Sequence, residues 1–237
     1  MTAPGVPATQ TAPTVRLFVA AFPPPVAVDH LAAAVTGLAM ARAGTSAGVR
    51  LAREEQWHLT LAFLGEVPAS LVPVAERAMT DCAGNGAANF AADGAAGFVG
   101  PVTLRIGGAG RFDTAGRSGA RGDTVVWAGL LGDTDRLGDL ADRLRAAMRS
   151  VSVPFDPRPY RPHLTLARVG ERYPRAELRH DLDRLDRYLG PQWTIEALCL
   201  VRSHRGPGRP PTYQRLRRAP LGPEGALGPE GGGPVSR

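Results

Sequence analysis

Lysine is absent from this chain of 237 residues, so all 28 of its basic side chains are arginine. ATP-dependent ligation through a lysine that accepts the nucleotidyl group is therefore excluded. The formal net charge is +6 and the sequence pI is near 10.3. Arginine suits phosphate groups, but the positive charge is scattered along the chain. The composition permits an anionic partner such as RNA without identifying one.

Cysteine is almost absent as well. Cys82 and Cys199 lie far apart without Cys-x-x-Cys spacing, which argues against a disulfide framework and a cysteine zinc site and fits a reducing compartment. No apolar run is long enough to cross a bilayer, and residues 1–14 lack the basic start and apolar core of a secretory signal. We expect a cytoplasmic, soluble monomer with no membrane partner.

Composition divides the chain into one folded domain and two tails. Residues 1–14 are rich in Ala, Pro and Thr, and residues 219–237 repeat Leu-Gly-Pro-Glu-Gly; we expect both tails to be disordered. The single domain is expected at residues 15–218, which are numerous enough to bury a substantial core.

Hydrophobic periodicity predicts a mixture of strands and helices inside this domain. Strands are expected at 15–22, 58–64, 99–106, 124–130, 163–169, 193–202 and 212–217, with a short one near Val49; helices are expected at 26–42, 69–82, 134–149 and 175–188. Glycine-rich connections fill 84–97 and 107–122. The second should be a long loop, and a phosphate cradle is disfavoured because no Lys-Ser/Thr follows its glycines. The order of elements predicts two βαβ-type halves of similar layout.

The tetrapeptide His-Leu-Thr-Leu occurs twice, beginning at His58 and at His163, and each copy lies in an expected strand. Side chains alternate between the faces of a strand, so each copy presents one imidazole and one hydroxyl on one face and two leucines on the other. Two imidazoles are what phosphodiester cleavage without a metal needs, one to accept a proton and one to donate it. Two amphipathic strands that share a tetrapeptide by chance are the alternative interpretation.

Three segments of the chain resemble the opening strand and the two signature motifs of the 2H phosphoesterase superfamily. They are Val-Arg-Leu-Phe-Val-Ala-Ala-Phe at 15–22, Trp-His-Leu-Thr-Leu-Ala-Phe-Leu-Gly at 57–65 and Tyr-Arg-Pro-His-Leu-Thr-Leu-Ala-Arg at 160–168. More narrowly, they resemble the LigT-like bacterial RNA 2′,3′-cyclic phosphodiesterases, formerly called 2′-5′ RNA ligases. The resemblance runs from about Val15 to about Leu216, and residues 198–216, with Ser203 and Tyr213, resemble the closing hairpin of that family.

This resemblance implies an α+β fold of two lobes, in which two antiparallel sheets face a central cleft, helices lie outside and the halves are related by a pseudo-two-fold. It also implies that His58 donates a proton to the leaving O3′ and that His163 accepts a proton from water, which would yield a 2′-phosphomonoester. The residues themselves do not orient these two roles. Exchanging them would change which product forms.

Other polar residues beside the motifs are candidates for binding phosphate. Thr60 and Thr165 follow the histidines on the same strand face and can donate hydrogen bonds to phosphate oxygens. Arg168 lies five residues after His163, so strict alternation puts it on the opposite face and only a twist or the end of the strand brings it to the site. The resemblance implies a phosphate clamp there, and a surface arginine that closes the strand is the alternative. Phe63 occupies the same offset in the first motif.

Two aromatic residues flank the motifs. Trp57 is expected in the core, whereas Tyr160 is a candidate for stacking on a base. His30, His180 and His204 have no partner motif and are expected to be surface or core residues. Neither motif carries a second ligand at metal-binding spacing, so no metal and no cofactor are expected.

The sequence favours metal-independent hydrolysis of an RNA 2′,3′-cyclic phosphodiester. A second enzymatic alternative is a cyclic phosphodiesterase that acts on a small cyclic nucleotide such as an ADP-ribose cyclic phosphate. A third, from another class, is a non-catalytic RNA-binding module, which would not need two titratable groups. The expected partners are accordingly RNA ends or small cyclic-phosphate nucleotides.

Overall fold

The computed structural model describes residues 13–84, 101–115, 121–206 and 210–221. Its strands are β1 Thr14–Ala21, β2 Val49–Leu51, β3 Leu59–Pro68, β4 Thr103–Ala115, β5 Arg121–Gly132, β6 Leu164–Val169, β7 Leu189–Thr194, β8 Ala197–His204 and β9 Thr212–Pro220. Its helices are α1 Pro25–Thr36, α2 Ala39–Ala43, α3 Val72–Gly84, α4 Thr134–Ser150 and α5 Arg175–Asp186, with short 3₁₀ turns at Thr45–Ala47, Glu54–Gln56 and Ala69–Leu71. The expected α+β class is confirmed.

The strands form two antiparallel groups that are joined into one sheet. The order is β7-β4-β5-β6-β3-β1-β8-β9, and β2 pairs with β6 beside β3. Read outward from the centre, β6-β5-β4-β7 on one side matches β3-β1-β8-β9 on the other. The pseudo-two-fold therefore passes between β3 and β6, whose connection is the pairing of Leu59 with Leu164. The two expected sheets are thus continuous through this one residue pair.

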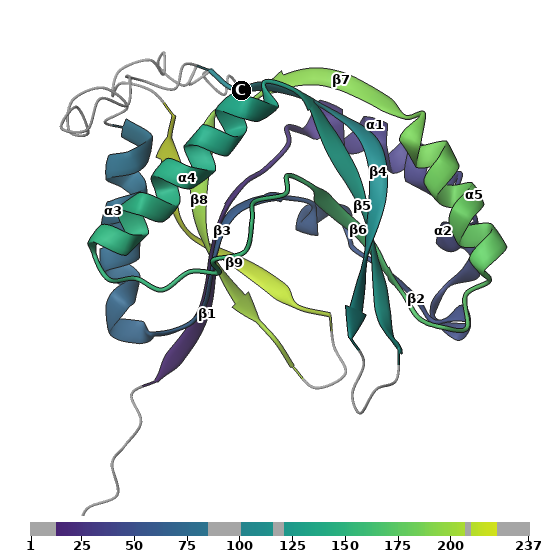
Figure 1. Ribbon diagram of the computed structural model, residues 1–237, viewed down its shortest axis with the longest axis horizontal. Coiled ribbons are helices and arrows are strands. Elements are labelled where there is room, and N and C mark those ends of the chain that lie inside the picture. The colour runs from purple at the N-terminus through teal and green to yellow at the C-terminus, as the bar shows by residue number, and fades with distance from the viewer. Residues whose placement is uncertain (1–12, 85–100, 116–120, 207–209, 222–237) are drawn as a thin grey trace, which may run out of the picture.

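The helices cross between the two halves. After β1 the chain passes to α1 and α2, which pack near β7 and α5, and then returns to β3; after β5 it passes to α4, which packs on α3 and β3, and then returns to β6. Figure 1 shows α3 and α4 beside β8 and β9, and α1, α2 and α5 on the far side of β4 and β5. Each half therefore has the expected strand–helix–strand order, but its neighbouring strands are antiparallel. No described helix has the length and apolar character to cross a membrane.

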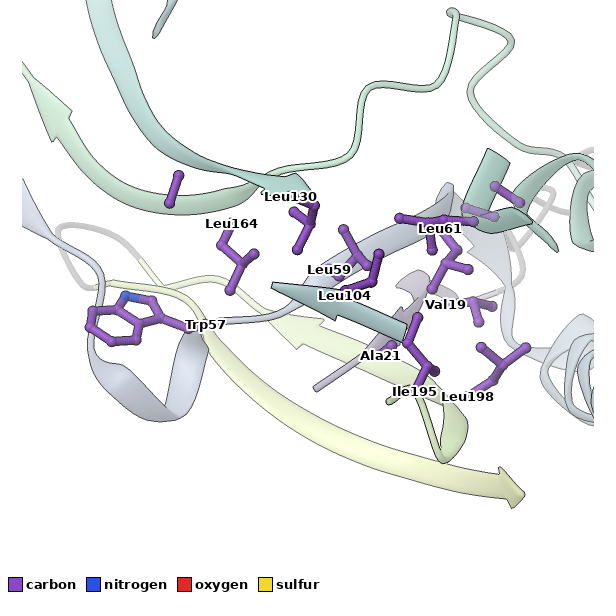
Figure 2. Packing of buried hydrophobic residues seen from close by; sticks show 14 of the residues in the cluster. Val19, Ala21, Trp57, Leu59, Leu61, Leu104, Leu130, Leu164, Ile195 and Leu198 are labelled. Carbon is purple, nitrogen blue, oxygen red and sulfur yellow. The ribbon is translucent and has the colours of Figure 1, made fainter. Parts of the chain in front are cut away.

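The motif leucines build the core where the two groups of strands meet. Leu59, Leu61, Leu164 and Leu166 are all at most 1% exposed. Figure 2 shows Leu59 and Leu164 among buried side chains from several strands. Trp57 is buried as well, which confirms its expected place in the core. Because the leucines face inward, the histidines and threonines between them face the other side of the strands.

Two glycine-rich or alanine-rich regions differ from expectation. Residues 107–122 were expected to form a loop, but β4 continues through Gly107 and Gly110 to Ala115, and β5 begins at Arg121. The glycines serve close packing across the hairpin: a Cβ on Gly110 would overlap the indole of Trp127, and one on Gly107 would press on Leu131. The expected helix at 26–42 is divided into α1 and α2.

The division of that helix coincides with a side-chain cap at the start of α2. Asp181 of α5 is fully buried and accepts hydrogen bonds from the backbone N–H groups of Ala39 and Met40, at 2.8 Å each, and from the Tyr173 hydroxyl. A carboxylate at the start of α2 satisfies helix N–H groups that have no partner within the helix. The chain therefore restarts a helix at a cap supplied from a distant segment.

The remaining elements follow the expected pattern with shifted ends. The expected strand at 193–202 is two strands, β7 and β8, and β9 continues to Pro220, where Ala219 is buried, so the folded chain extends past the expected domain end. Residues 1–12, most of the connection at 84–97 and the tail from 222 lie outside the described residues.

Candidate active site

The pairing of β3 with β6 brings the two motifs together. Leu59 is opposite Leu164 in an antiparallel register. Continuing that register by one residue in each direction sets His58 opposite Thr165, and Thr60 opposite His163. All four polar side chains then lie on the same face, because each is one residue from the paired leucines.

Both histidines are held by the same backbone contact. Each Nδ1 lies against the carbonyl oxygen two residues earlier: that of Gln56, at 2.5 Å, for His58, and that of Arg161, at 2.7 Å, for His163. A carbonyl oxygen only accepts, so Nδ1 carries the hydrogen in each ring. In the neutral imidazole Nε2 is then an acceptor, and in the protonated ring it is a donor. With Nδ1–H fixed in this way, each ring accepts a proton at Nε2 when it is neutral and donates one from Nε2 when it is protonated.

Aromatic rings contact each imidazole. His58 stacks on Phe18, with ring centroids 4.7 Å apart, and meets the edge of Tyr213 at 5.2 Å. His163 lies edge-on to Phe112 at 5.0 Å and near Trp127 at 6.1 Å. These rings fix the orientation of the imidazoles and remove them partly from water.

Burial lowers the pKa of both histidines. Desolvation lowers the pKa of His58 to about 4, the hydrogen bond to Gln56 opposes that shift, and the charge of His163 adds to it. Desolvation also lowers the pKa of His163, against the hydrogen bond to Arg161. The charge of His163 acts on His58 because the pairing of β3 with β6 sets the two motifs side by side. Near neutral pH both are uncharged until an anion raises their affinity for protons.

A β-bulge in each motif strand brings the residue five positions after the histidine to the site face. In β3, Ala20 pairs with Thr60 and Val19 with Ala62, so Leu61 is left between them. In β6 the pairing likewise skips Leu166. One extra residue reverses the alternation that follows it.

The bulge in β6 is the physical reason that Arg168 lies on the same face as Thr165, which strict alternation does not allow. Arg168 pairs with Val125, two residues from Trp127 along β5, and its charge lowers the pKa of Tyr213, which burial raises overall. In β3 the matching bulge places Phe63 beside Phe18. The site is thus asymmetric, with a guanidinium in one half and a phenyl ring in the other.

In the part of the chain that the structure describes, the ring contacts of His163 are with Phe112 and Trp127 and not with Tyr160. The Tyr160 ring packs against the core with the Arg145 guanidinium 5.5 Å from its centre, and its buried hydroxyl has no hydrogen-bond partner among the described residues. The aromatic neighbours that sequence reasoning missed are Phe112 and Trp127 for His163, and Phe18 for His58. Alternation along β1 and β5 signals Phe18 and Trp127, which lie on the face opposite the core residues. Phe112 of β4 reaches that face only through the register shift between Ile106 and Ala109.

Metal ligands do not gather at this site. Among the described residues there is no group of three or more His, Cys, Asp or Glu side chains that could hold a metal ion. His30 hydrogen-bonds to Tyr188 and His204 to Gln214, so these two have local partners away from the motifs.

Comparisons with known proteins agree with this arrangement. The family model of the 2′-5′ RNA ligase superfamily matches residues 22–207. A curated relative, an RNA 2′,3′-cyclic phosphodiesterase of Geobacillus stearothermophilus, is 33% identical over 116 residues, which are 48% of this chain and 31% of that protein. The match thus spans about a third of the relative's length.

Solved structures share the fold. The structure of TT0787 from Thermus thermophilus aligns with a TM-score of 0.62 and 29% identity, covering 88% of this chain and 99% of that one. LigT of E. coli, solved with 3′-AMP, aligns with a TM-score of 0.59 and 23% identity over 88% of this chain and 99% of its own. Together with the paired motifs, the family match confirms the resemblance: this chain belongs to the 2′-5′ RNA ligase superfamily, the LigT-like 2H phosphoesterases.

Proposed function

We propose that the protein hydrolyses RNA 2′,3′-cyclic phosphodiesters to 2′-phosphomonoesters without a metal. The observation that carries this proposal is the matched pair of imidazoles beside the Leu59–Leu164 pairing, each with Nδ1 held by a backbone carbonyl. A binding module has no need of two titratable rings in equivalent settings. The name of the curated relative supports the same substrate.

In the proposed reaction His163 Nε2 accepts a proton from water as the water oxygen attacks phosphorus. His58 Nε2 donates its proton to O3′ as the P–O3′ bond breaks, which leaves the phosphate on O2′. Because burial keeps both rings neutral in the free protein, the anionic substrate itself must favour the proton on His58. After the reaction His163 is protonated and His58 is neutral, so transfer of one proton from His163 to His58 readies the site for a second turnover.

Three residues are proposed to hold the phosphate. The hydroxyls of Thr60 and Thr165 donate hydrogen bonds to its non-bridging oxygens, and Arg168 offsets the negative charge that develops on them. Preorganised donors of this kind contribute most in sites partly removed from water. The pairing that sets Thr165 opposite His58 and Thr60 opposite His163 gives each imidazole a neighbouring hydroxyl.

The direct test is incubation of EDTA-treated protein with an oligoribonucleotide that ends in a 2′,3′-cyclic phosphate, followed by separation of 2′- and 3′-phosphate products. Conversion to the 2′-phosphate is expected. A 3′-phosphate product would exchange the two histidine roles. Binding without turnover would favour the RNA-binding module, and turnover of an ADP-ribose cyclic phosphate alone would favour the small nucleotide. Activity that is lost on chelation and restored by zinc or manganese would contradict the two-histidine mechanism.

A further inference from the structure

A row of polar side chains crosses the sheet beside His58. In register across β3, β1, β8 and β9 the row consists of Glu66, Arg16, Ser203 and Tyr213. Residues in register on neighbouring strands lie about 5 Å apart on a common face. Tyr213 also contacts His58, so this polar row adjoins the catalytic imidazole directly.

The polar row lies two residues along β1 from the position that contacts His58, where the reacting phosphate is proposed to bind. Arg16 and Phe18 are two residues apart on β1 and share a face, which separates them by about 7 Å. Phe18 in turn stacks on His58. This separation is comparable to that between neighbouring phosphates along an RNA strand. A group held by Arg16 would thus be the next phosphate and not the reacting one.

The row borders a pocket in which positive charge exceeds negative charge. The pocket has a volume of about 250 Å³, and its charged or titratable lining residues are Arg16, Glu66, Arg202, His204 and Arg205. Glu66 is the one carboxylate in that lining, and it meets Arg16 at 3.5 Å with more than half of its side chain exposed. Arg202 pairs with Leu17 and so lies on the other face, which leaves Arg16 and Arg205 against one carboxylate, and the pocket attracts anions.

Arg16 is held in place by its surroundings. Its guanidinium lies 4.6 Å from the centre of the Phe63 ring, and its side chain is 24% exposed. Arg205, just after β8, has its pKa lowered by partial desolvation and then by the charges of Arg16 and Arg168. Two guanidinium groups that line one pocket favour an anion between them, and arginine binds phosphate through two donors at once.

We propose that Arg16 and Arg205 form a second phosphate subsite, which binds the phosphate on the 5′ oxygen of the nucleotide whose cyclic phosphate lies between the histidines. The assignment rests on the proposed function. It makes the 5′-phosphate a determinant of specificity: RNA 3′ ends and 5′-phosphorylated nucleotides bind well, and nucleosides that carry only a cyclic phosphate bind poorly.

Equilibrium binding tests the subsite without turnover. Calorimetry would compare adenosine 2′,5′-bisphosphate with adenosine 2′-monophosphate, which differ only in the 5′-phosphate. The parent should bind the bisphosphate about tenfold more tightly, the effect of one charge-assisted hydrogen bond or more. Arg16→Gln and Arg205→Gln should each reduce that ratio severalfold. Arg136→Gln, an exposed arginine on α4, is the matched control and should keep it.

Equal affinity of the parent for the two ligands, or a ratio that neither variant changes, would overturn the subsite. Arg16 also contacts Phe63 and Glu66, so circular dichroism should establish that its variant is folded. Arg205 follows the end of β8, and its variant gives an answer even if the Arg16 variant fails to fold.

Turnover measurements distinguish a 5′-monophosphate from a phosphodiester as the group bound. They also distinguish failure of the proposed function from failure of the subsite. The substrates are 2′,3′-cyclic AMP, its 5′-phosphorylated form and the dinucleotide ApA with a terminal cyclic phosphate. If both phosphorylated substrates exceed 2′,3′-cyclic AMP in kcat/KM, any 5′-phosphate suffices; if the dinucleotide alone does, the subsite reads a phosphodiester. Failure to cleave any of them would refute the proposed function, whereas the binding ratio would still decide the subsite. Cleavage of all three at equal kcat/KM would refute the subsite alone.

Discussion

At each motif histidine two physical effects oppose one another. The backbone carbonyl at Nδ1 favours the protonated ring, while desolvation by the surrounding aromatic rings favours the neutral one. Desolvation prevails at both His58 and His163. The free protein therefore holds two neutral acceptors, and the proton needed by the leaving group is taken up below neutral pH or in response to the anionic substrate.

This balance sets the expected dependence of activity on pH. Productive enzyme needs one ring protonated and one neutral, so kcat/KM should follow a bell whose limbs lie at the pKa values of the free protein. With the pKa of His58 near 4 and that of His163 below 6.5, the optimum of kcat/KM should lie below pH 6.5. The profile of kcat should lie at higher pH, because bound phosphate favours the imidazolium. Rates measured from pH 4 to 9 test both, and an optimum of kcat/KM at pH 8 would contradict the account.

Arg168 supplies the guanidinium of the site, and its removal should affect chemistry more than folding. Arg168→Ala is expected to lower kcat/KM by about 10²–10³-fold, the typical cost of one preorganised donor. Arg168→Lys should restore part of the loss, because an ammonium keeps the charge but not the paired donors. Arg179→Ala, an exposed arginine on α5, is the control. Unchanged kcat/KM in Arg168→Ala would make the residue a surface arginine.

Within the β4–β5 hairpin, a glycine makes room for a ring that contacts His163. A Cβ on Gly110 would overlap the indole of Trp127, which lies across the hairpin. Gly110→Ala should therefore cost about 1–3 kcal/mol of unfolding free energy through overpacking, and should lower kcat/KM by displacing Trp127. Urea denaturation and steady-state kinetics measure the two effects.

The matched control for this substitution is Gly138 on α4, where a Cβ meets nothing within 4 Å. Gly138→Ala should be neutral or stabilise the protein by about 0.5–1 kcal/mol, since alanine is the better helix former. Equal effects at the two glycines would show that Trp127 does not need the space at Gly110.

The cap of α2 is a separate element of stability. Removing the Asp181 carboxylate leaves the N–H groups of Ala39 and Met40 and the Tyr173 hydroxyl without their acceptor. Asp181→Ala should cost about 1–3 kcal/mol of unfolding free energy, as expected for buried donors left unpaired. Asp183→Ala, exposed on the same helix, should change it by less than about 0.5 kcal/mol. A similar loss in both variants would contradict this role of Asp181.

The elements that sequence predicted best carry strong periodic patterns. The expected helices at 134–149 and 175–188 are α4 and α5, because their apolar spacing alone defines them. The extension of β4 and β5 beyond the strands expected at 99–106 and 124–130 was missed, because the glycines there also mark turns and only the position of Trp127 on the partner strand explains Gly110. The bulge that turns Arg168 toward the site depends on the pairing of β6 with β5. The residues around Gly110 do not show that Trp127 lies across from them, and those around Arg168 do not show that β5 is their partner. Contacts between distant segments therefore decided the extended hairpin and the bulge.

For the whole molecule, the pseudo-two-fold and the site coincide. The two groups of strands meet at Leu59 and Leu164, and each histidine is the residue just before one of these leucines. The helices that cross between the halves pack on the outer side of both groups. Formation of the site therefore requires both halves to be folded. The family resemblance implied that the two motif histidines meet, whereas the direct pairing of β3 with β6 in one sheet was not predicted.

His58 and His163 are proposed to act as one unit. The most direct measurement is kcat/KM on an oligoribonucleotide 2′,3′-cyclic phosphate for His58→Ala, His163→Ala and the double variant. Each single substitution should abolish most of the rate, and the double variant should be little slower than either, because groups that act together are not additive. All three should fold, since the leucines beside the histidines hold the strands. Near-full activity in either folded single variant, alongside an active parent, would contradict the account.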